Sequence, residues 1–356
     1  MKTIRPAAQW ALAIGASLTL ALPLDWFAIP AAFLVGPMMA GILCALGGVT
    51  IRLPRGAFVA GQALIGCLIA RAITASLLTS IVQSWPFMVA AILGAVAAST
   101  LVGWLLVRFG SLPGSTAAWG TSAGAASAMV AMSQDFGADP LLVAMMQYLR
   151  VIFVVLTASL VAGLWLGPEH PVSGAVAAAP SPLAGASIIS LIETLAVAAA
   201  GAWLGLRLKI PAGGLLVPMT VAALLQGAGY LTVTLPKGLL LLGYGAIGLS
   251  IGLRFSRDLL RSTMRAIPEM LAATFALIGL CGVSAWVLVR LLHTDALTAY
   301  LATSPGGLDS VAIIAAGSNA DVPFVLALQT LRLLVVVLIG PFLAKLLSKV
   351  AKHKKQ

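Results

Sequence analysis

Two arginines lie deep inside apolar stretches of the chain, where a membrane would surround them. Arg150 and Arg332 each come eleven residues after an aspartate, Asp139 or Asp321, that begins a long apolar segment. At about 1.5 Å per helical residue, each arginine is expected about 16 Å into a bilayer, close to its midplane. A guanidinium at that depth costs at least roughly 2.5 kcal/mol, so it must face a partner, a cavity or a ligand. The planar fork of each arginine predicts a binding site for a small anion.

Other polar residues complete this predicted anion site. Gln147 and Gln329 precede the arginines by three residues and share their helix face. Asp309 is the first choice, and Glu193 the second, for a carboxylate that couples anion binding to a proton or a sodium ion. Alternatively, the arginines form structural ion pairs with Asp309, Asp135 or Glu193. The predicted substrate-binding residues are Arg150, Arg332, Gln147, Gln329, Thr121, Ser122, Gly124, Thr303, Ser304, Gly306 and Gly307.

Both arginines belong to an internal duplication. Residues 104–150 align with residues 286–332 without a gap, at an offset of 182, and fifteen of the forty-seven positions are identical. A shared apolar composition does not account for the matched polar and aromatic residues, which include Trp104 with Trp286, Arg108 with Arg290, Thr116 with Thr298, Asp139 with Asp321, and both the glutamines and the arginines. Secondary transporters build a central binding site between two such repeats.

The composition predicts that nearly the whole chain lies in a membrane. Hydrophobic residues make up 61% and charged residues 9%, and the mean hydropathy is +1.08. The net charge of +11 comes from short basic clusters between apolar segments and from a Lys-rich tail. This distribution is typical of cytoplasmic loops and argues against nucleic-acid binding. The three cysteines and three histidines are scattered, so we expect no metal site and no cofactor.

Each repeat divides into six apolar segments. The expected domains are a first membrane repeat (1–166), a linker (167–185), a second membrane repeat (186–347) and a basic cytoplasmic tail (348–356). The first segment has a counterpart in the second repeat, so we expect a retained span rather than a cleaved signal peptide. The segments are expected near 8–28, 30–50, 55–76, 85–109, 114–134 and 139–166, and near 186–208, 211–233, 236–255, 267–292, 296–318 and 322–347.

The fifth segment of each repeat is rich in Gly, Ser, Thr and Ala. In the second repeat Pro305 precedes Gly306 and Gly307, a sequence that breaks a helix. Lipid cannot satisfy the exposed backbone groups, which are tolerated only against protein or water. We therefore predict a re-entrant or broken segment that lines a substrate path. The alternative is a close-packed helix with small residues at its interface.

The distribution of basic residues favours an inverted second repeat. If each fifth segment enters and leaves on one side, each repeat has five true spans, and an odd number of spans reverses the second repeat. Sixteen basic residues then lie on the cytoplasmic side and three outside, as the positive-inside rule requires. The predicted fold is therefore an all-α polytopic membrane protein with two inverted repeats of five transmembrane helices plus one re-entrant or broken segment each. Both termini are expected to be cytoplasmic.

Several segments resemble those of the AbrB family of bacterial membrane proteins. They are residues 111–115, 131–139, 146–150, 299–309 and 315–321, and the resemblance covers essentially the full chain. It implies a location in the bacterial inner membrane. The family has been labelled a regulator and an ammonia monooxygenase, but the residues give no helix-turn-helix in a soluble context and no cluster able to hold copper or iron. The architecture is also similar, by analogy only, to glutamate and citrate sodium symporters.

These observations predict a secondary transporter of small organic anions that works by alternating access and is coupled to a proton or a sodium ion. We expect no enzymatic activity. The expected partners are the anion, the coupling ion and the lipid bilayer, and a homodimer is one possibility. The alternatives are a membrane-embedded regulator or sensor that acts through a partner protein, and a channel.

Overall fold

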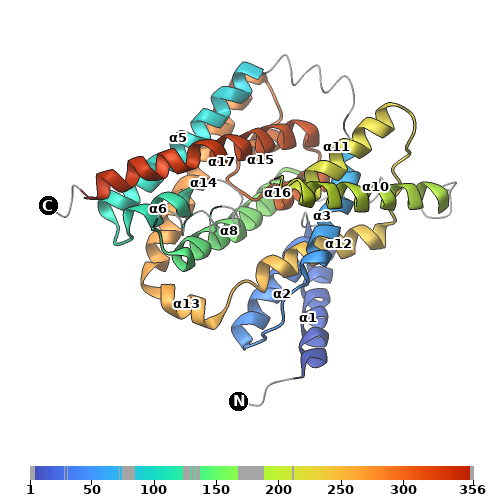
Figure 1. The fold of residues 1–356 in the computed structure, drawn as a ribbon, viewed down its shortest axis with the longest axis horizontal. Coiled ribbons are helices and arrows are strands. Elements are labelled where there is room, and N and C mark those ends of the chain that lie inside the picture. The colour runs from blue at the N-terminus through green and yellow to red at the C-terminus, as the bar shows by residue number, and fades with distance from the viewer. Residues whose placement is uncertain are drawn as a thin grey trace. The chain divides into compact units, whose positions relative to one another are not determined.

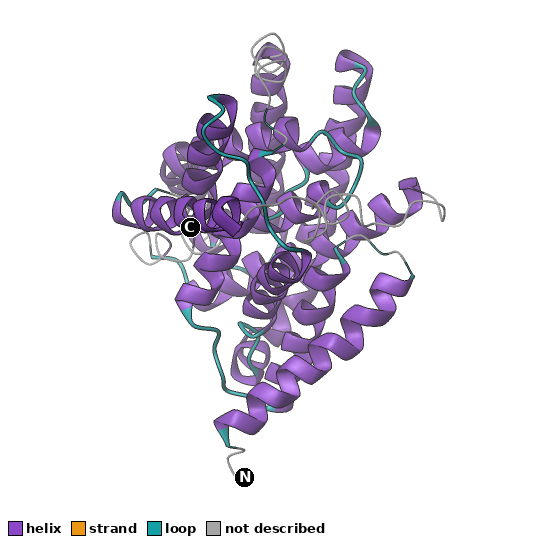
Figure 2. Cartoon of the chain, turned by 90° about the vertical axis from the view of Figure 1, so that its right-hand side faces the viewer, coloured by secondary structure: helices purple, strands orange, loops and turns teal. Residues whose placement is uncertain are grey.

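The computed structural model describes residues 5–27, 29, 31–71, 73, 85–122, 129, 133, 137–166, 188–210 and 212–352, and these residues form helices and no strand (Figure 2). Six helical stretches are long and apolar enough to cross a membrane. The predicted all-α class is therefore confirmed for the described residues, and the six long apolar helices are consistent with a membrane protein. The stretches comprise α1 (Pro6–Trp26), α5 (Trp85–Phe109), α8 (Pro140–Leu166), α10 (Ile188–Arg207), α13 (Arg257–Thr263) continued through a short 3-10 turn by α14 (Ile267–Leu292), and α17 (Val322–Lys352) (Figure 1).

Four further apolar helices are shorter than the sequence predicted. Each has 15 or 16 residues and so rises about 24 Å, less than the roughly 30 Å of a hydrocarbon core. The predicted starts near 55 and 236 agree with the helices that begin at Arg55 and Lys237, whereas the predicted carboxyl-terminal ends were wrong because the helices stop earlier. Gly48, with φ of 97°, ends the first of them, and Pro54 and Pro236 directly precede two others. The four helices are α2 (Ala32–Gly47), α3 (Arg55–Ala70), α11 (Gly213–Gly227) and α12 (Lys237–Gly252).

The chain folds into two compact units, and each unit takes helices from both halves of the sequence. The first unit comprises Met1–Ile81, Ser159–Arg257 and Ala312–Pro323. The second comprises Val82–Ala158, Asp258–Val311 and Phe324–Gln356. The halves of the duplication are thus not the units of compact folding.

In the first unit, the order in which helices pack against one another is the same from either end. α1 contacts α2, α2 contacts α12, α12 contacts α3, α3 contacts α11, and α11 contacts α10. The sequence offset makes α1 equivalent to α10, α2 to α11, and α3 to α12. Reading the series backwards therefore gives the same series of equivalent helices.

Matched glycines allow two equivalent helix pairs of the first unit to approach closely. A Cβ atom added to Gly66 of α3 would strike the carbonyl oxygen of Leu215 in α11. A Cβ atom added to Gly248 of α12 would strike the carbonyl oxygen of Leu34 in α2. The two contacts occupy equivalent positions, because Gly66 corresponds to Gly248 and Leu34 to Leu215. Small residues at such crossings are how membrane helices bring their backbones together.

Two further features of the first unit occur in matched positions. α3 and α12 cross at Gly61 and Gly243, where a Cβ atom on Gly61 would lie 2.9 Å from the carbonyl oxygen of Gly243. Ala31 and Ala212, which directly precede α2 and α11, have positive φ values of 58° and 53°. Alanine seldom adopts this left-handed conformation, so its occurrence at two equivalent residues indicates that both helices are entered by the same turn.

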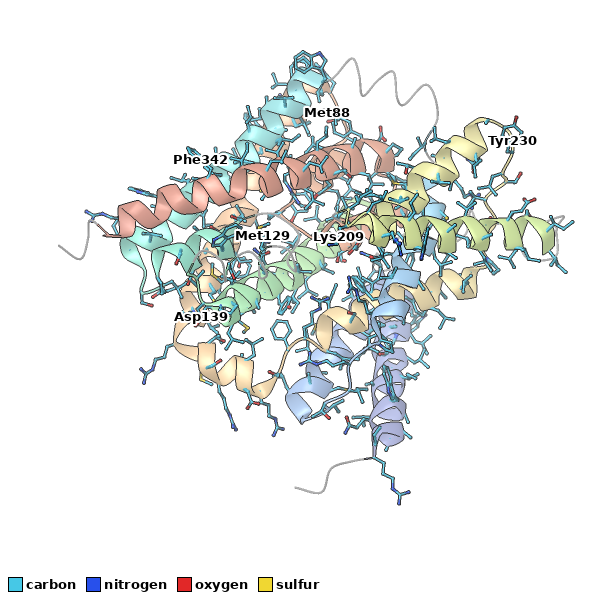
Figure 3. The ribbon with its side chains drawn as sticks, viewed as in Figure 1. Met88, Met129, Asp139, Lys209, Tyr230 and Phe342 are labelled. Atoms are coloured by element: carbon cyan, nitrogen blue, oxygen red, sulfur yellow. The ribbon has the colours of Figure 1, made fainter. Side chains whose placement is uncertain are left out.

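The second unit is built around α5 and α14, which pack together. α5 also contacts α6 (Gly114–Thr121), and α14 contacts the equivalent helix α15 (Ala296–Thr303). A small apolar core surrounds the fully buried Trp119 of α6, and Figure 3 labels one of its members, Met129. This unit contains the predicted arginines and glutamines.

Candidate functional site

The predicted fifth segment is broken in the second half of the chain. α15 has eight residues and ends at Thr303, the chain is non-helical from Ser304 to Gly307, and α16 (Leu308–Ala316) follows. The predicted break at Pro305 is therefore confirmed. In the first half, α6 also has eight residues and ends at Thr121, the residue equivalent to Thr303.

A glutamine and an arginine of α8 bind the carboxyl-terminal end of α6. The Nε2 atom of Gln147 donates hydrogen bonds to the carbonyl oxygens of Trp119 (2.9 Å), Gly120 (3.3 Å) and Ser122 (3.0 Å). Arg150 donates to the carbonyl oxygen of Ser122 at 2.8 Å and to Oε1 of Gln147 at 2.7 Å. The predicted shared face of these two residues is confirmed by this contact.

The equivalent pair on α17 binds the end of α15 in the same way. The Nε2 atom of Gln329 donates to the carbonyl oxygens of Leu301 (2.8 Å) and Ser304 (3.0 Å). Arg332 donates to the carbonyl oxygens of Ser304 (2.5 Å) and Gly306 (3.1 Å). Leu301 and Ser304 correspond to Trp119 and Ser122, so the two arrangements repeat at the offset of 182.

The chemistry of a helix end explains why these residue types are used. The last carbonyls of an α-helix have no partner within the helix, and the helix dipole places about half a negative charge there. A buried helix end therefore needs donors, and it favours cations. Arg150 and Arg332 supply both while only 2% and 3% exposed, and the glutamines are equally buried. The sequence predicted the buried arginines but missed the main-chain carbonyls as their partners.

The helix ends neutralise the buried charge only in part. The Nε atom of Arg332 and the Oε1 atom of Gln329 are buried without a hydrogen-bond partner among the described residues. Gly306, which accepts a hydrogen bond from Arg332, packs against Val154 of α8, one helical turn after Arg150. One helix end supplies about half a negative charge, which is less than the unit positive charge of the Arg332 guanidinium.

The four predicted hydroxyls all donate hydrogen bonds to main-chain carbonyl oxygens. Thr121 and Ser122 donate to the carbonyl oxygens of residues 117 and 118, at 2.9 and 2.8 Å. Thr303 donates to Ala299 at 2.9 Å and also to Cys281 of α14 at 3.1 Å, and Ser304 donates to residue 301 at 3.0 Å. In this structure the residues after each helix therefore contact the arginines through carbonyl oxygens rather than hydroxyl groups.

The predicted glycines have different surroundings. A Cβ atom on Gly306 would lie 2.8 Å from the side chain of Val311 and 2.9 Å from that of Val154, so packing already requires a glycine there. Gly307 is half-buried, and a Cβ atom there would meet only the Ser310 hydroxyl, at 4.0 Å. Gly124 lies outside the described residues.

The predicted carboxylates lie in different parts of the structure. Asp309 is half-buried in the first turn of α16, two residues after Gly307, in the unit that holds the arginines. Glu193 is exposed on α10, in the other unit. Asp135, the third candidate for an ion pair, lies outside the described residues. Of these carboxylates, Asp309 is thus the one that the structure describes in the arginine-bearing unit.

Asp139 caps α8, as the sequence predicted. Its Oδ1 atom accepts hydrogen bonds from the amides of Leu141 (2.9 Å) and Leu142 (3.4 Å), and Figure 3 labels it at the start of the helix. The amide of Asp139 donates to the Thr116 hydroxyl of α6 at 3.0 Å. This bond fixes the start of α8 against α6, a contact that the sequence did not predict. Asp321 directly precedes α17, as predicted.

Within the described part of the chain, no group of three or more His, Cys, Asp or Glu side chains could hold a metal ion.

Comparison with known proteins identifies relatives over most of the chain. The profile of a family described as "Transition state regulatory protein AbrB" matches residues 33–348. The chain is 46% identical over 349 residues to a protein of Escherichia coli (strain K12) named "Putative regulator AbrB", covering 98% of this chain and 99% of that protein. It is 26% identical over 305 residues to "Uncharacterized protein YhjN" of Bacillus subtilis (strain 168), covering 83% of this chain and 79% of that protein.

Proposed function

The chain belongs to the AbrB family, and we propose that it is a secondary transporter of small organic anions. The observation that supports this function is the pair of buried arginines in the second unit, each of which binds the end of a short helix, and the half charge of a helix end is smaller than the charge of Arg332. Burying an uncompensated charge costs several kcal/mol, so a bound anion would stabilise the pair. A carboxylate is suited to this role because its two oxygens match a guanidinium fork.

The proposed mechanism is alternating access, with the anion bound near the ends of α6 and α15. The second repeat would be inverted, with five spans and one broken segment in each repeat, and both termini would be cytoplasmic. The matched helix pairs of the first unit and the matched helix-end contacts of the second are consistent with two equivalent repeats. Asp309 would couple transport to a proton or a sodium ion, because it is the acidic residue that directly follows the break. Glu193 remains the second choice.

Uptake into proteoliposomes tests this proposal. The purified protein would be reconstituted and offered a panel of labelled mono- and dicarboxylates, with a sodium gradient, a proton gradient or neither. We expect saturable uptake of at least one carboxylate that depends on one of the two gradients. Gradient-independent flux that does not saturate would indicate a channel instead, and no uptake of any anion would contradict the proposal.

A regulatory role is a second candidate, because the names of both the family and the Escherichia coli relative contain the word regulatory or regulator. Such a role requires a partner protein and a surface to bind it. The segment from Arg254 to Glu269, which contains α13, offers exposed residues, including Arg257, Arg261 and Arg265. Cross-linking in cells through a photoreactive residue at position 261 would capture a partner if this role is correct. A transporter without a partner would yield lipid adducts only.

A further inference from the structure

One end of the first unit brings several helix termini together. α1 and α3 begin there, and α2 and α12 end there. A cluster of buried side chains joins these termini, with Trp10 and Ile51 packed at its edge. The cluster consists of Ala13, Cys44, Val49, Leu249 and Leu253. A hydrogen bond from the amide of Thr50 to Oε1 of Gln9, at 3.0 Å, further ties the start of α1 to the loop after α2.

Two arginines at this end hold helix termini. Arg52 donates to the carbonyl oxygen of Leu253, at the end of α12, at 2.6 Å. Arg257 donates to the carbonyl oxygen of Leu46, in the last turn of α2. The two arginines thus cap the neighbouring ends of the packed helices α2 and α12.

The side chains of two more arginines at this end do not hold other described parts of the structure. Arg5, the residue before α1, and Arg55, the first residue of α3, are both exposed. Their side chains make no hydrogen bond or ion pair with other described residues. Arg254, after α12, adds a fifth positive charge. We call these five arginines the basic end of the first unit.

The described carboxylates of the first unit lie away from the basic end. Asp25 is in the last turn of α1, about 30 Å along the helix from Arg5. Glu193 of α10 adjoins Thr194, which accepts a hydrogen bond at 3.1 Å from the amide of Thr234, just before the opposite end of α12. Asp321 follows a segment in which Gly317 lies beside the start of α2, again the opposite end. The nearest acidic residue along the chain is Asp258, directly after Arg257.

Apolar side chains are exposed next to these arginines. Leu12 of α1 is 53% exposed and Leu43 of α2 is 58% exposed, each within two turns of the basic end. Trp10 is half-buried at the same level, as aromatic residues at a membrane interface often are. The surface therefore has a cationic rim above exposed hydrocarbon, which fits a molecule with an anionic head and apolar chains.

We propose that the basic end of the first unit binds the headgroup of an anionic phospholipid. The phosphate accepts hydrogen bonds from the guanidinium groups of Arg5 and Arg55, and the acyl chains lie along the exposed leucines of α1 and α2. Arginine suits this role because its fork binds phosphate oxygens in pairs. The bound lipid bridges the starts of α1 and α3. The site lies in the unit that does not contain the paired arginines Arg150 and Arg332, so it does not depend on the proposed transport function.

The duplication supplies a matched control for this proposal. Arg55 and Lys237 are equivalent residues: each is exposed, follows a proline and begins its helix, α3 or α12. The two residues lie at different places, however, because α3 begins at the basic end whereas α12 finishes there. Lys237 is therefore about 24 Å from that end along its own helix. Arg55→Gln and Lys237→Gln remove one charge each from equivalent positions at different places on the unit.

The experiment measures binding of phosphatidylglycerol and of phosphatidylcholine to the full-length protein in mixed micelles, by native mass spectrometry and by the shift in melting temperature. We expect preference for phosphatidylglycerol, and about fivefold weaker binding for each of Arg5→Gln and Arg55→Gln, since a basic residue near an anionic membrane surface contributes about 1 kcal/mol. Lys237→Gln should bind like the unchanged protein. The melting temperature without lipid should stay constant, because neither Arg5 nor Arg55 holds other described residues.

Three outcomes would overturn the proposal. Equal binding of the two lipids would show that no anionic headgroup is recognised. An equal loss in Lys237→Gln and Arg55→Gln would show that net charge, and not this surface, attracts the lipid. Binding of an acidic peptide or a DNA duplex in preference to phosphatidylglycerol would assign the surface to a different partner.

Discussion

Each buried arginine of the second unit has both a structural contact and a charge that the contact does not fully neutralise. Arg332 binds two carbonyl oxygens of the broken segment through its terminal nitrogens, while its Nε atom has no partner among the described residues. A residue used only to cap a helix would be replaceable by another donor. A residue that also holds an anion would not, because the anion requires the positive charge and the fork together.

Arg332→Lys separates these two roles. Lysine keeps the charge but cannot bind the carbonyl oxygens of Ser304 and Gly306 with a planar fork. We expect uptake of the transported anion to fall about tenfold or more, since a hydrogen bond from a charged group contributes about 1.5–3 kcal/mol. Arg150→Lys should behave in the same way. Arg290→Lys is the control, because Arg290 stacks on Trp286 at the end of α14. The measurement is the initial rate of uptake in proteoliposomes.

Normal uptake in both Arg150→Lys and Arg332→Lys would show that the anion binds elsewhere. Loss of folding in either variant, with rescue by Asp309→Asn, would identify a structural ion pair instead.

Gln147→Leu tests the contribution of the glutamine to the helix end. The substitution leaves the carbonyl oxygens of Trp119 and Gly120 without their side-chain donor in a buried site. We expect a loss of stability of about 1–3 kcal/mol, because a buried acceptor without a partner bears its full desolvation cost. Gln226→Leu on α11, where no side-chain hydrogen bond is seen among the described residues, is the matched control. Equal melting temperatures of the two variants in detergent would contradict this interpretation.

The sequence predicted the important residues of the site better than their roles. Depth in an apolar segment and repetition at one offset identified Arg150, Arg332 and the two glutamines. Their partners could not be predicted, because a main-chain carbonyl has no signature in the sequence. The prediction that Thr303 and Ser304 bind a substrate did not consider that hydroxyl groups in or just after a helix readily donate to the carbonyl three or four residues earlier.

At the scale of the helices, close approach through glycine determines how the first unit packs. The α3–α11 and α12–α2 crossings each place a glycine against a main-chain carbonyl of the facing helix. Backbone atoms cannot rotate away as a flexible side chain can. The crossing glycines should therefore tolerate substitution much less well than other glycines of the same helices.

Gly66→Ala and Gly248→Ala should both destabilise the protein. The added methyl group would strike the carbonyl oxygen of Leu215 or Leu34, and overpacking of this kind typically costs about 1–3 kcal/mol. Gly56→Ala in α3 and Gly238→Ala in α12 are the controls, since nothing lies within 4 Å of a Cβ atom at either position. Each control should be stabilising by about 0.5–1 kcal/mol, because alanine favours the helix. Thermal unfolding of the four variants checks the prediction, and similar losses at Gly56 and Gly66 would contradict it.

Apolar segments predicted which stretches are helical, but the ends of the helices depended on local turns. The break at Pro305 was predictable, because proline and two glycines follow one another. The early ends of α2 and α11 were not predictable, since the apolar composition continues past both helices. The turns that end them lie at Gly48 after α2 and near Gly229 after α11. The arrangement of the helices into two mixed units could not be predicted either, because the duplication suggested two halves.

At the scale of the whole molecule, both compact units require both repeats. α2 and α3 pack on α12 and α11 across the duplication, and α5 packs on α14. Residues 1–166 expressed alone should therefore be degraded, whereas co-expression with residues 186–356 should restore a stable complex. Pulse-chase labelling and co-purification through a tag on one fragment measure this. A stable, monodisperse first repeat on its own would contradict the mixed composition of the units.

The inverted topology predicts that the segment between α12 and α14, which contains α13, is cytoplasmic and that the loop between α11 and α12 is periplasmic. The reason is the sixteen-to-three division of basic residues that the inverted arrangement gives. Ser262→Cys, in α13, and Thr232→Cys, in the loop before α12, place exposed thiols in the two segments. The native Cys44, Cys67 and Cys281 are all buried, so they should react slowly.

A membrane-impermeant maleimide added to intact spheroplasts should label position 232 and not position 262. After lysis both should react, as should an added cysteine at position 257. Labelling of position 257 or 262 from outside would place the Arg-rich loop in the periplasm, and the second repeat would then run parallel to the first.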